Sequence, residues 1–274
     1  MGKLKYSWLF IFCFCFTSVF ANDTTINFSL QKSIKGNFIN FTVDNLGNIF
    51  LVTDNNQLKK YDANLSVVSV FNDVKQYGNI SFIDASNPLK ILIFYKDFST
   101  ILVLDRFLSR RNTIDLRSLN IVEVKTIAQS YDNNIWLFDE LDASIKKIDD
   151  YGKLVMKTTD FRLLFDDAYN PSTMIDSNGM LYLYNEEKGW LVFDYYGALK
   201  SKFNTENWKD VQVNNKTLVG RNANHFYLLQ PPLPNINVYT TNIDLINATK
   251  VLQGNDLLYV LTKEGLSIYQ LQGK

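Results

Sequence analysis

Aspartates recur along this chain at a regular spacing that could form a ring of metal ligands. One set follows apolar runs, is separated by 43, 44 and 45 residues, and consists of Asp62, Asp105, Asp149 and Asp194. A second set lies in polar turns and consists of Asp44, Asp84, Asp132 and Asp176. Repeated carboxylates suggest a ring of calcium ligands, but calcium needs several oxygens from one loop, and no Asp-x-Asp-x-Asp run occurs. Both sets are therefore predicted to cap turns, and no metal is expected.

Other residue types that carry catalysis are scarce. The single histidine, His225, is predicted at the start of a strand, and one histidine is no metal cluster. The only cysteines, Cys13 and Cys15, lie in an N-terminal segment that is predicted to be removed. The mature chain would then have no thiol chemistry and no disulfide. No cofactor is predicted, and no catalytic residue is assigned.

The residues best suited to binding lie in the longest predicted loop, from Thr158 to Pro171. It is unusually apolar, has an acidic tip and contains Phe161, Phe165, Asp166 and Tyr169. Two interpretations are open: a short helix that packs against neighbouring strands, or a surface that docks a protein. Loops predicted on the same side add Phe98, Asp139, Glu140, Glu186, Glu187 and Trp208. Aromatic anchors surrounded by carboxylates suit protein contact, and they could also hold a sugar by stacking.

These residues belong to a repeated unit of short strands. After the first strand comes an Asp-Asn-Leu-Gly-Asn turn, and the strands of the first unit are predicted at 39–43, 49–52, 58–61 and 66–71. The pattern recurs three more times up to Asp194 and continues in degraded form to Tyr239. A period of about 40 to 45 residues with four strands per unit is typical of β-propeller blades. The chain is therefore predicted to be all-β.

The chain ends one strand short of a complete sixth blade. Its last predicted strands are 249–252, 257–261 and 266–271. A free edge there would invite aggregation, whereas the alternating segment from Thr25 to Ser33 can supply a fourth strand, antiparallel beside residues 266–271. The prediction is a six-bladed β-propeller in which an N-terminal strand completes the last blade and closes the ring. This single domain would span residues 22–274.

The blades also resemble a known family. The run from Asp44 to Val52, followed by Leu58 to Asp62, resembles blades of NHL-type and related six-bladed propellers, and residues 176–183 with 192–197 resemble the same pattern. The resemblance covers the first four blades better than the last two, and it implies the fold. It implies no single activity, because propellers of this kind are hydrolases, lyases, sugar binders or docking platforms.

Residues 1–21 are typical of a secretory signal peptide. Lys3 and Lys5 precede an apolar run from Trp8 to Phe16, and Ala21 supplies the small residue before a cleavage site. The run is shorter than the roughly 20 residues of a membrane-spanning helix, so no direct membrane insertion is expected. Its removal leaves 26 basic and 28 acidic side chains, which argues against nucleic acid and anionic lipid as partners. The predicted location is the periplasm or the cell surface.

The leading hypothesis is a non-catalytic, secreted propeller that binds a protein. The partner would belong to the cell envelope, for example an outer-membrane barrel that the disc caps or plugs, or a component of secretion machinery. The alternative hypothesis is a propeller that binds or cleaves carbohydrate with carboxylates and tyrosines at the channel mouth. An open central pocket with two carboxylates about 5 to 10 Å apart would favour this alternative, and a mouth closed by apolar side chains would exclude it.

Overall fold

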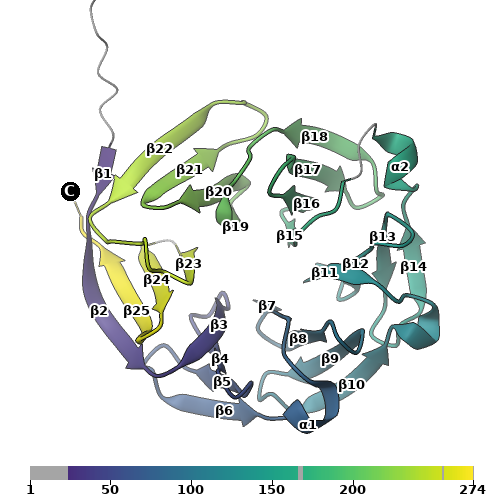
Figure 1. Cartoon of the computed structure of the whole chain (residues 1–274), viewed down its shortest axis with the longest axis horizontal. Coiled ribbons are helices and arrows are strands. Elements are labelled where there is room, and N and C mark those ends of the chain that lie inside the picture. Colours follow the sequence, from purple (N-terminus) through teal and green to yellow (C-terminus); the bar gives the residue numbers. More distant parts are fainter. Residues whose placement is uncertain (1–23, 166–168, 255, 274) are drawn as a thin grey trace, which may run out of the picture.

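Six small sheets stand around a central axis like the blades of a propeller, and the chain passes around the ring from each blade to the next (Figure 1). The computed structural model describes residues 24–165, 169–254 and 256–273. The predicted signal peptide and Asp166 lie outside these described residues. The arrangement confirms the predicted all-β, six-bladed fold.

Within a blade the strands follow one another from the channel to the rim, and we call them a, b, c and d in that order. Blade 1 consists of β3 (Phe38–Val43), β4 (Ile49–Thr53), β5 (Leu58–Tyr61) and β6 (Val67–Phe71). Blade 2 consists of β7 (Phe82–Asn87), β8 (Lys90–Tyr95), β9 (Thr100–Asp105) and β10 (Arg110–Asp115). Blade 3 consists of β11 (Val124–Gln129), β12 (Ile135–Asp139), β13 (Ser144–Ile148) and β14 (Leu154–Lys157).

The second half of the ring takes in both chain ends. Blade 4 consists of β15 (Thr173–Ser177), β16 (Met180–Asn185), β17 (Gly189–Asp194) and β18 (Leu199–Phe203). Blade 5 consists of β19 (Lys209–Asn214), β20 (Thr217–Asn222), β21 (His225–Leu229), β22 (Ile236–Thr241) and β1 (Thr24–Ile26). Blade 6 consists of β23 (Lys250–Gln253), β24 (Leu257–Thr262), β25 (Gly265–Leu271) and β2 (Phe28–Lys35). Short helices in the connections are α1 (Val74–Tyr77), η1 (Arg117–Leu119) and α2 (Phe161–Leu164).

The hydrophobic core lies between the blades rather than within them. Every residue of β4 and β8 is buried, because neighbouring blades cover both faces of these strands. Phe50 and Leu58 of blade 1 pack with Ile91 and Leu102 of blade 2 in one cluster. A blade therefore buries its apolar faces only when its neighbours are present.

The ring closes as predicted. Strand β2 pairs antiparallel with β25, from Phe28 opposite Leu271 to Lys35 opposite Gly265. Gly265 has a φ of +140°, and a Cβ there would lie 2.1 Å from the carbonyl oxygen of Ile34. A glycine is therefore required at this close approach of the two chain ends.

The N-terminal segment also makes a pairing that the alternation pattern did not predict. The predicted strand from Thr25 to Ser33 is split at Asn27, and its first part, β1, pairs parallel with β22 at the rim of blade 5. The side chain of Asn242 holds the split: its Oδ1 accepts the Phe28 N–H at 2.7 Å, and its Nδ2 donates to the Phe28 carbonyl at 2.9 Å. The segment therefore joins two blades.

Aspartates of the first repeated set shape the turns between strands c and d. The Oδ1 of Asp62 accepts hydrogen bonds from the N–H groups of Asn64 and Ser66, two and four residues later (2.9 and 2.8 Å). The same pair of bonds forms at Asp105, Asp149 and Asp194. The fourth residue of each turn has a positive φ, which explains the glycines Gly152 and Gly197. The predicted role of these four aspartates in capping the turns is confirmed.

Candidate functional site

The connections of the propeller alternate between its two faces. The b–c turns and the connections between blades lie on one face, which we call the b–c face. The a–b and c–d turns lie on the opposite face, which we call the a–b face. Those predicted binding residues that the structure describes all lie at or beside connections of the b–c face.

The predicted binding residues divide by burial. Phe98 and Glu187 are exposed, whereas Glu140 and Phe165 are half-buried. Four others are buried, namely Asp139, Phe161, Tyr169 and Trp208. Trp208 lies against Gly220, where a Cβ would be 2.6 Å from the indole ring. These four side chains pack beneath the surface of the b–c face and are not accessible to a partner.

A cluster of packed aromatic rings anchors the long connection between blades 3 and 4. The ring centroid of Phe161 lies 5.5 Å from that of Phe138 and 5.4 Å from that of Phe193. The Tyr169 hydroxyl donates to two backbone carbonyls of blade 4, each at 2.9 Å. The interpretation of this segment as a short helix packed on the neighbouring blade is confirmed. Only the part that this packing leaves exposed is available for contact.

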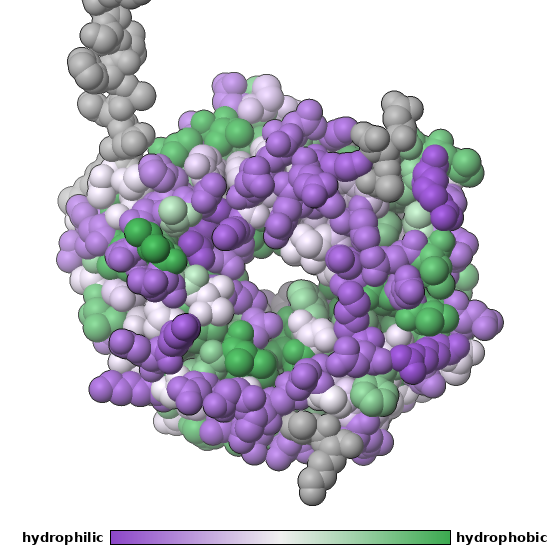
Figure 2. Space-filling view, in the orientation of Figure 1, coloured by the Kyte–Doolittle hydropathy of each residue, from purple (hydrophilic) through white to green (hydrophobic). Residues whose placement is uncertain are grey.

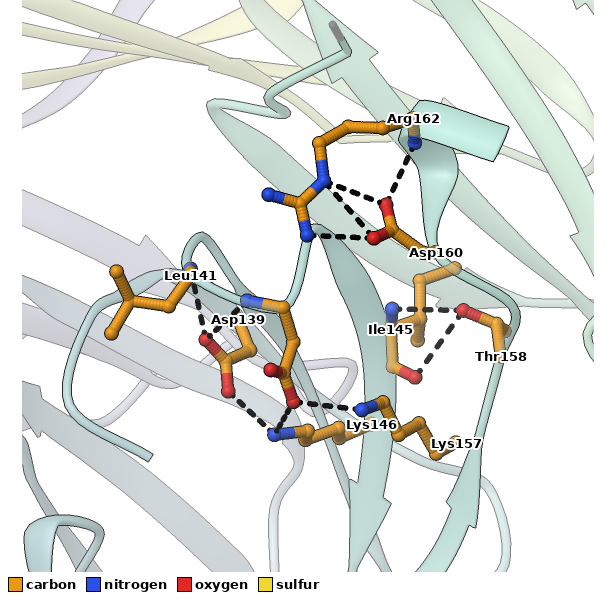
Figure 3. A network of polar contacts seen from close by, with 9 residues as sticks. Asp139, Leu141, Ile145, Lys146, Lys157, Thr158, Asp160 and Arg162 are labelled. Carbon is orange, nitrogen blue, oxygen red and sulfur yellow. Dashed lines mark hydrogen bonds and ion pairs between the residues drawn. The ribbon is translucent and has the colours of Figure 1, made fainter. Parts of the chain in front are cut away.

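An ion-pair network holds the b–c turn of blade 3; Asp139 and Lys146 are buried in it, whereas Asp142 and Lys157 are partly exposed (Figure 3). The side chain of Asp139 is 2% exposed and pairs with Lys146 at 2.5 Å. Its second oxygen accepts the N–H of Leu141 at 3.1 Å. Lys146 also pairs with Asp142 at 2.6 Å, and Asp142 pairs with Lys157 at 2.8 Å. The turn is therefore fixed in a conformation that leaves Leu141 54% exposed.

The network makes stability depend on pH. Hydrogen bonds from Lys146 and Lys157 lower the pKa of Asp142 from 3.8 to about 2. Asp142 therefore contributes stability above its unfolded pKa, and this contribution is lost as the pH falls towards its folded pKa. We expect the wild type to be more stable than an Asp142→Asn variant at about pH 6, and the difference to shrink between about pH 4 and pH 2. Urea midpoints measure it; a constant difference would contradict this assignment.

Exposed apolar side chains follow the connections around part of the b–c face. We call this set the apolar arc; it consists of Phe98, Val122, Leu141, Leu163 and Leu164, which are 48, 48, 54, 79 and 49% exposed. The space-filling view shows hydrophobic patches at the rim beside α2 and beside blade 3, while polar groups predominate around the channel (Figure 2). None of the residues of the arc lines the cavity of the channel.

Hydrogen bonds join the connections that carry the apolar arc. They run from Ser99 Oγ to the Val122 carbonyl (2.8 Å), from the Glu140 N–H to the Glu123 carbonyl (2.8 Å), and from the Phe161 N–H to the Ala143 carbonyl (2.7 Å). Each bond links a b–c turn to a connection between two blades. The side chains of the arc are therefore carried by loops that support one another, which lowers the cost of ordering them on binding.

A cavity of about 350 Å³ continues the arc between α2 and blade 4. Leu164, Phe165 and Tyr169 contribute apolar surface to it, and Glu187 and Glu206 are exposed at its wall. Lys202 and Asn204 also line it, so polar and apolar groups share its wall, as they do at protein interfaces. The cavity is large enough to receive an anchoring side chain of a partner.

The central channel is open, and both polar and apolar side chains line it. It contains a cavity of about 460 Å³ that is lined by Asp84, Asp176 and Asp210, among others, and the opening is visible at the centre of the disc (Figure 2). Asp84 accepts the N–H of Gln129 at 2.7 Å, and Asp210 accepts that of Val251 at 3.0 Å. Each of these two carboxylates joins its blade to the next one. The channel mouth is not closed by apolar side chains.

Two titratable groups of the channel wall have shifted pKa values. Burial raises the pKa of Asp176, although Trp136, Tyr195 and Ser130 donate hydrogen bonds to its carboxylate. Burial lowers the pKa of Lys250 to about 8. Shifted groups in a cavity are candidates for a functional site. Asp176 also lines a second cavity, at the a–b end of the channel.

Within residues 24–165, 169–254 and 256–273, no three His, Cys, Asp or Glu side chains are grouped to hold a metal ion. His225 begins β21, as predicted, and is exposed. No helix in the described part of the chain is long and apolar enough to cross a membrane.

Solved structures share the fold, whereas no protein-family model and no curated protein matches the sequence. A streptogramin B lyase gives a TM-score of 0.59 at 17% identity, over 85% of this chain and 78% of the lyase. A catalytically inactive His-to-Ala virginiamycin B lyase from Staphylococcus aureus, solved with quinupristin, gives 0.61 at 14% identity, over 90% of each chain. The extracellular domain of the one-component system BT4673 from B. thetaiotaomicron gives 0.55 at 13% identity, over 86% of this chain and 32% of that one. At these identities the likeness shows the fold alone, and the protein is a six-bladed β-propeller.

Proposed function

We propose that this propeller is an exported, non-catalytic module that binds another protein of the cell envelope through the apolar arc. The observation that carries the proposal is the exposure of five large apolar side chains on connections that are hydrogen-bonded to one another. A single exposed leucine needs no explanation, but a larger exposed apolar patch rimmed by polar residues marks a contact site.

The extent of the arc favours a macromolecule over a small ligand. Its side chains stand on connections of blades 2, 3 and 4, whereas a small molecule is usually enclosed by one concave pocket. A stable protein interface buries about 800 Å² on each partner, which an arc of this length can help to supply. The cavity beside α2 adds a place for one anchor, flanked by Glu187, Glu206 and Lys202. The partner should therefore present apolar or aromatic anchors within a polar rim.

Two observations support an envelope location for the partner. Residues 1–21 have the composition of a secretory signal. Two solved neighbours are extracellular domains of the signalling systems BT4673 and BT3049, and this chain spans 32 and 39% of those longer chains. The partner classes that fit are an outer-membrane barrel, which the disc would cap or plug, and a component of secretion machinery.

Photo-crosslinking from the arc tests the proposal. A photoreactive phenylalanine analogue in place of Leu163 is expected to form an adduct with one envelope protein in native cells. Replacing Phe98 and Leu141 by Ser should then reduce the adduct at least about tenfold, because apolar anchors contribute about 1 to 2 kcal/mol each. Both side chains are exposed, so the thermal unfolding midpoint should stay close to that of the wild type.

The matched control lies on the opposite face. Leu46 is 67% exposed in the a–b turn of blade 1, and the same analogue there should not form this adduct. Equal adducts from both positions would mean non-specific contact. Adducts with a second copy of the chain alone, or no adduct at all, would overturn the proposal.

A further inference from the structure

The a–b face carries a second cavity, at the other end of the channel from the b–c face. Its volume is about 620 Å³. Turns of four consecutive blades contribute to its wall, among them Asn45, Asn87, Gln129, Tyr131, Asp176 and Tyr195. The residues of the apolar arc take no part in it, so its chemistry has to be explained separately.

A stack of aromatic rings forms one side of this cavity. Tyr131 is 66% exposed and stacks on Tyr195, with centroids 4.1 Å apart and planes inclined by 17°. Trp136 stacks behind Tyr195 at 6.5 Å. The Lys147 ammonium lies 4.1 Å from the Trp136 ring centroid and pairs with Asp132 at 2.9 Å. Tyr131 is therefore held as a supported flat surface at the cavity.

One polar atom without a partner belongs to a residue that lines the same cavity. Gln129 is 5% exposed, and its Oε1 has no hydrogen-bond donor among the described residues. Its Nε2 donates only weakly, to the carbonyls of Ser130 (3.3 Å) and Asn134 (3.5 Å). The oxygen is buried behind the cavity wall, so a ligand hydroxyl bonds to it once the Gln129 side chain turns towards the cavity, and that bond satisfies an acceptor that otherwise has no donor. The exposed amide of Asn45 adds donors and an acceptor at the same cavity.

The charges around the stack are of both signs and favour neither a cation nor an anion. A cation would meet Lys147, whose ammonium already lies 5.8 Å from the Tyr131 ring and 5.5 Å from the Tyr195 ring. An anion would meet the carboxylate of Asp176, which accepts hydrogen bonds from Trp136 and Tyr195 at 2.9 Å each. A neutral ligand with one flat apolar face and several hydroxyl groups fits both restrictions.

We propose that this cavity binds a neutral carbohydrate. One face of a sugar ring stacks on Tyr131, and the sugar hydroxyls bond to Gln129 Oε1, to the Asn45 amide and to Asp176. Aromatic faces attract the positive edges of C–H groups, and amide and carboxylate oxygens accept hydrogen bonds from hydroxyls. The site binds without a chemical step, and it lies on the face opposite to the proposed protein contact.

Titration with defined oligosaccharides tests the site. The probes are maltohexaose, cellohexaose, mannohexaose and hexa-N-acetylchitohexaose, added to the chain of residues 22–274 and followed by calorimetry and saturation-transfer NMR. At least one probe is expected to bind saturably, and Tyr131→Ala should weaken it about tenfold because the stacking surface is lost. Tyr131→Phe keeps the ring and should bind as the wild type does.

Two further variants distinguish binding at this cavity from a general effect of substitution on binding or folding. Gln129→Met has a similar volume but no acceptor, so it should weaken binding without lowering the unfolding midpoint. Tyr151 is 86% exposed in the c–d turn of blade 3, and Tyr151→Ala should bind as the wild type does. The proposal is overturned if no probe binds at about 10 mM, or if Tyr131→Ala and Gln129→Met bind unchanged. The Phe98 and Leu141 variants should retain sugar binding, so the two proposals can fail separately.

Discussion

A chain that starts at Gly36, and so lacks β1 and β2, is expected to lose cooperative folding. Strand β2 supplies the outer strand of blade 6, and Phe28, which is 5% exposed, packs in the core cluster between blades 5 and 6. Its loss would remove a ladder of backbone hydrogen bonds, each contributing about 1 kcal/mol, and would expose β25 as an unprotected edge. A loss of about 5 kcal/mol or more equals much of a typical domain's stability.

Urea unfolding and size-exclusion chromatography measure this effect. The matched control starts at Asn27 and lacks only β1, which makes three residue pairs at the rim of blade 5. It should lose no more than about 1 to 2 kcal/mol and remain monomeric. A chain starting at Gly36 that unfolds at the same urea concentration as this control would show that β2 does not hold the ring closed.

Replacing Asp139 by Ala is expected to cost about 3 kcal/mol of stability and to weaken the proposed protein contact. The substitution leaves Lys146, whose side chain is 8% exposed, with Asp142 as its remaining carboxylate. Breaking a buried ion pair by removing one partner costs about 3 to 5 kcal/mol, and Asp142 offsets part of this. The Leu141 N–H also loses its acceptor, so the turn that positions Leu141 should loosen.

Denaturant unfolding and the crosslinking yield from position 163 measure the two consequences. Lys200→Ala is the matched control, because Lys200 pairs with Asp194 while 47% exposed. Such surface pairs contribute at most about 1 kcal/mol, and the variant should keep the full crosslinking yield. A stability loss for Asp139→Ala no larger than that of Lys200→Ala would contradict the role given to this network.

Turn chemistry was predictable because it depends on near neighbours. Asp62 and Asp194 bond to groups two and four residues ahead, so residue type and spacing suffice to predict the capped turns. Ring closure was also predictable, since a last blade with three strands needs a fourth and the N-terminal alternation can supply it. Both predictions follow from local sequence patterns and from the need to pair the backbone groups of an edge strand.

Other features depended on contacts that no local pattern reveals. Strand β7 begins at Phe82, and just before it the Ile80 N–H donates to the Asn56 side chain of blade 1 at 2.8 Å, a contact between blades. Strand β1 is three residues long and pairs parallel, so it has no hairpin signal. Asp139 and Trp208 appeared exposed because their types and loop positions suggested it, yet both are buried by neighbouring elements.

The sequence by itself determined the six-bladed ring, its capped turns and its closure by the N-terminal strand, because these follow from alternation and from bonds between near neighbours. Only the tertiary structure decided where the candidate sites lie. The apolar arc requires loops of three blades to bond to one another, and the aromatic cavity requires Tyr131 of blade 3 to stack on Tyr195 of blade 4. Such contacts exist only once the blades have packed face to face, since each blade buries its apolar surface against the next.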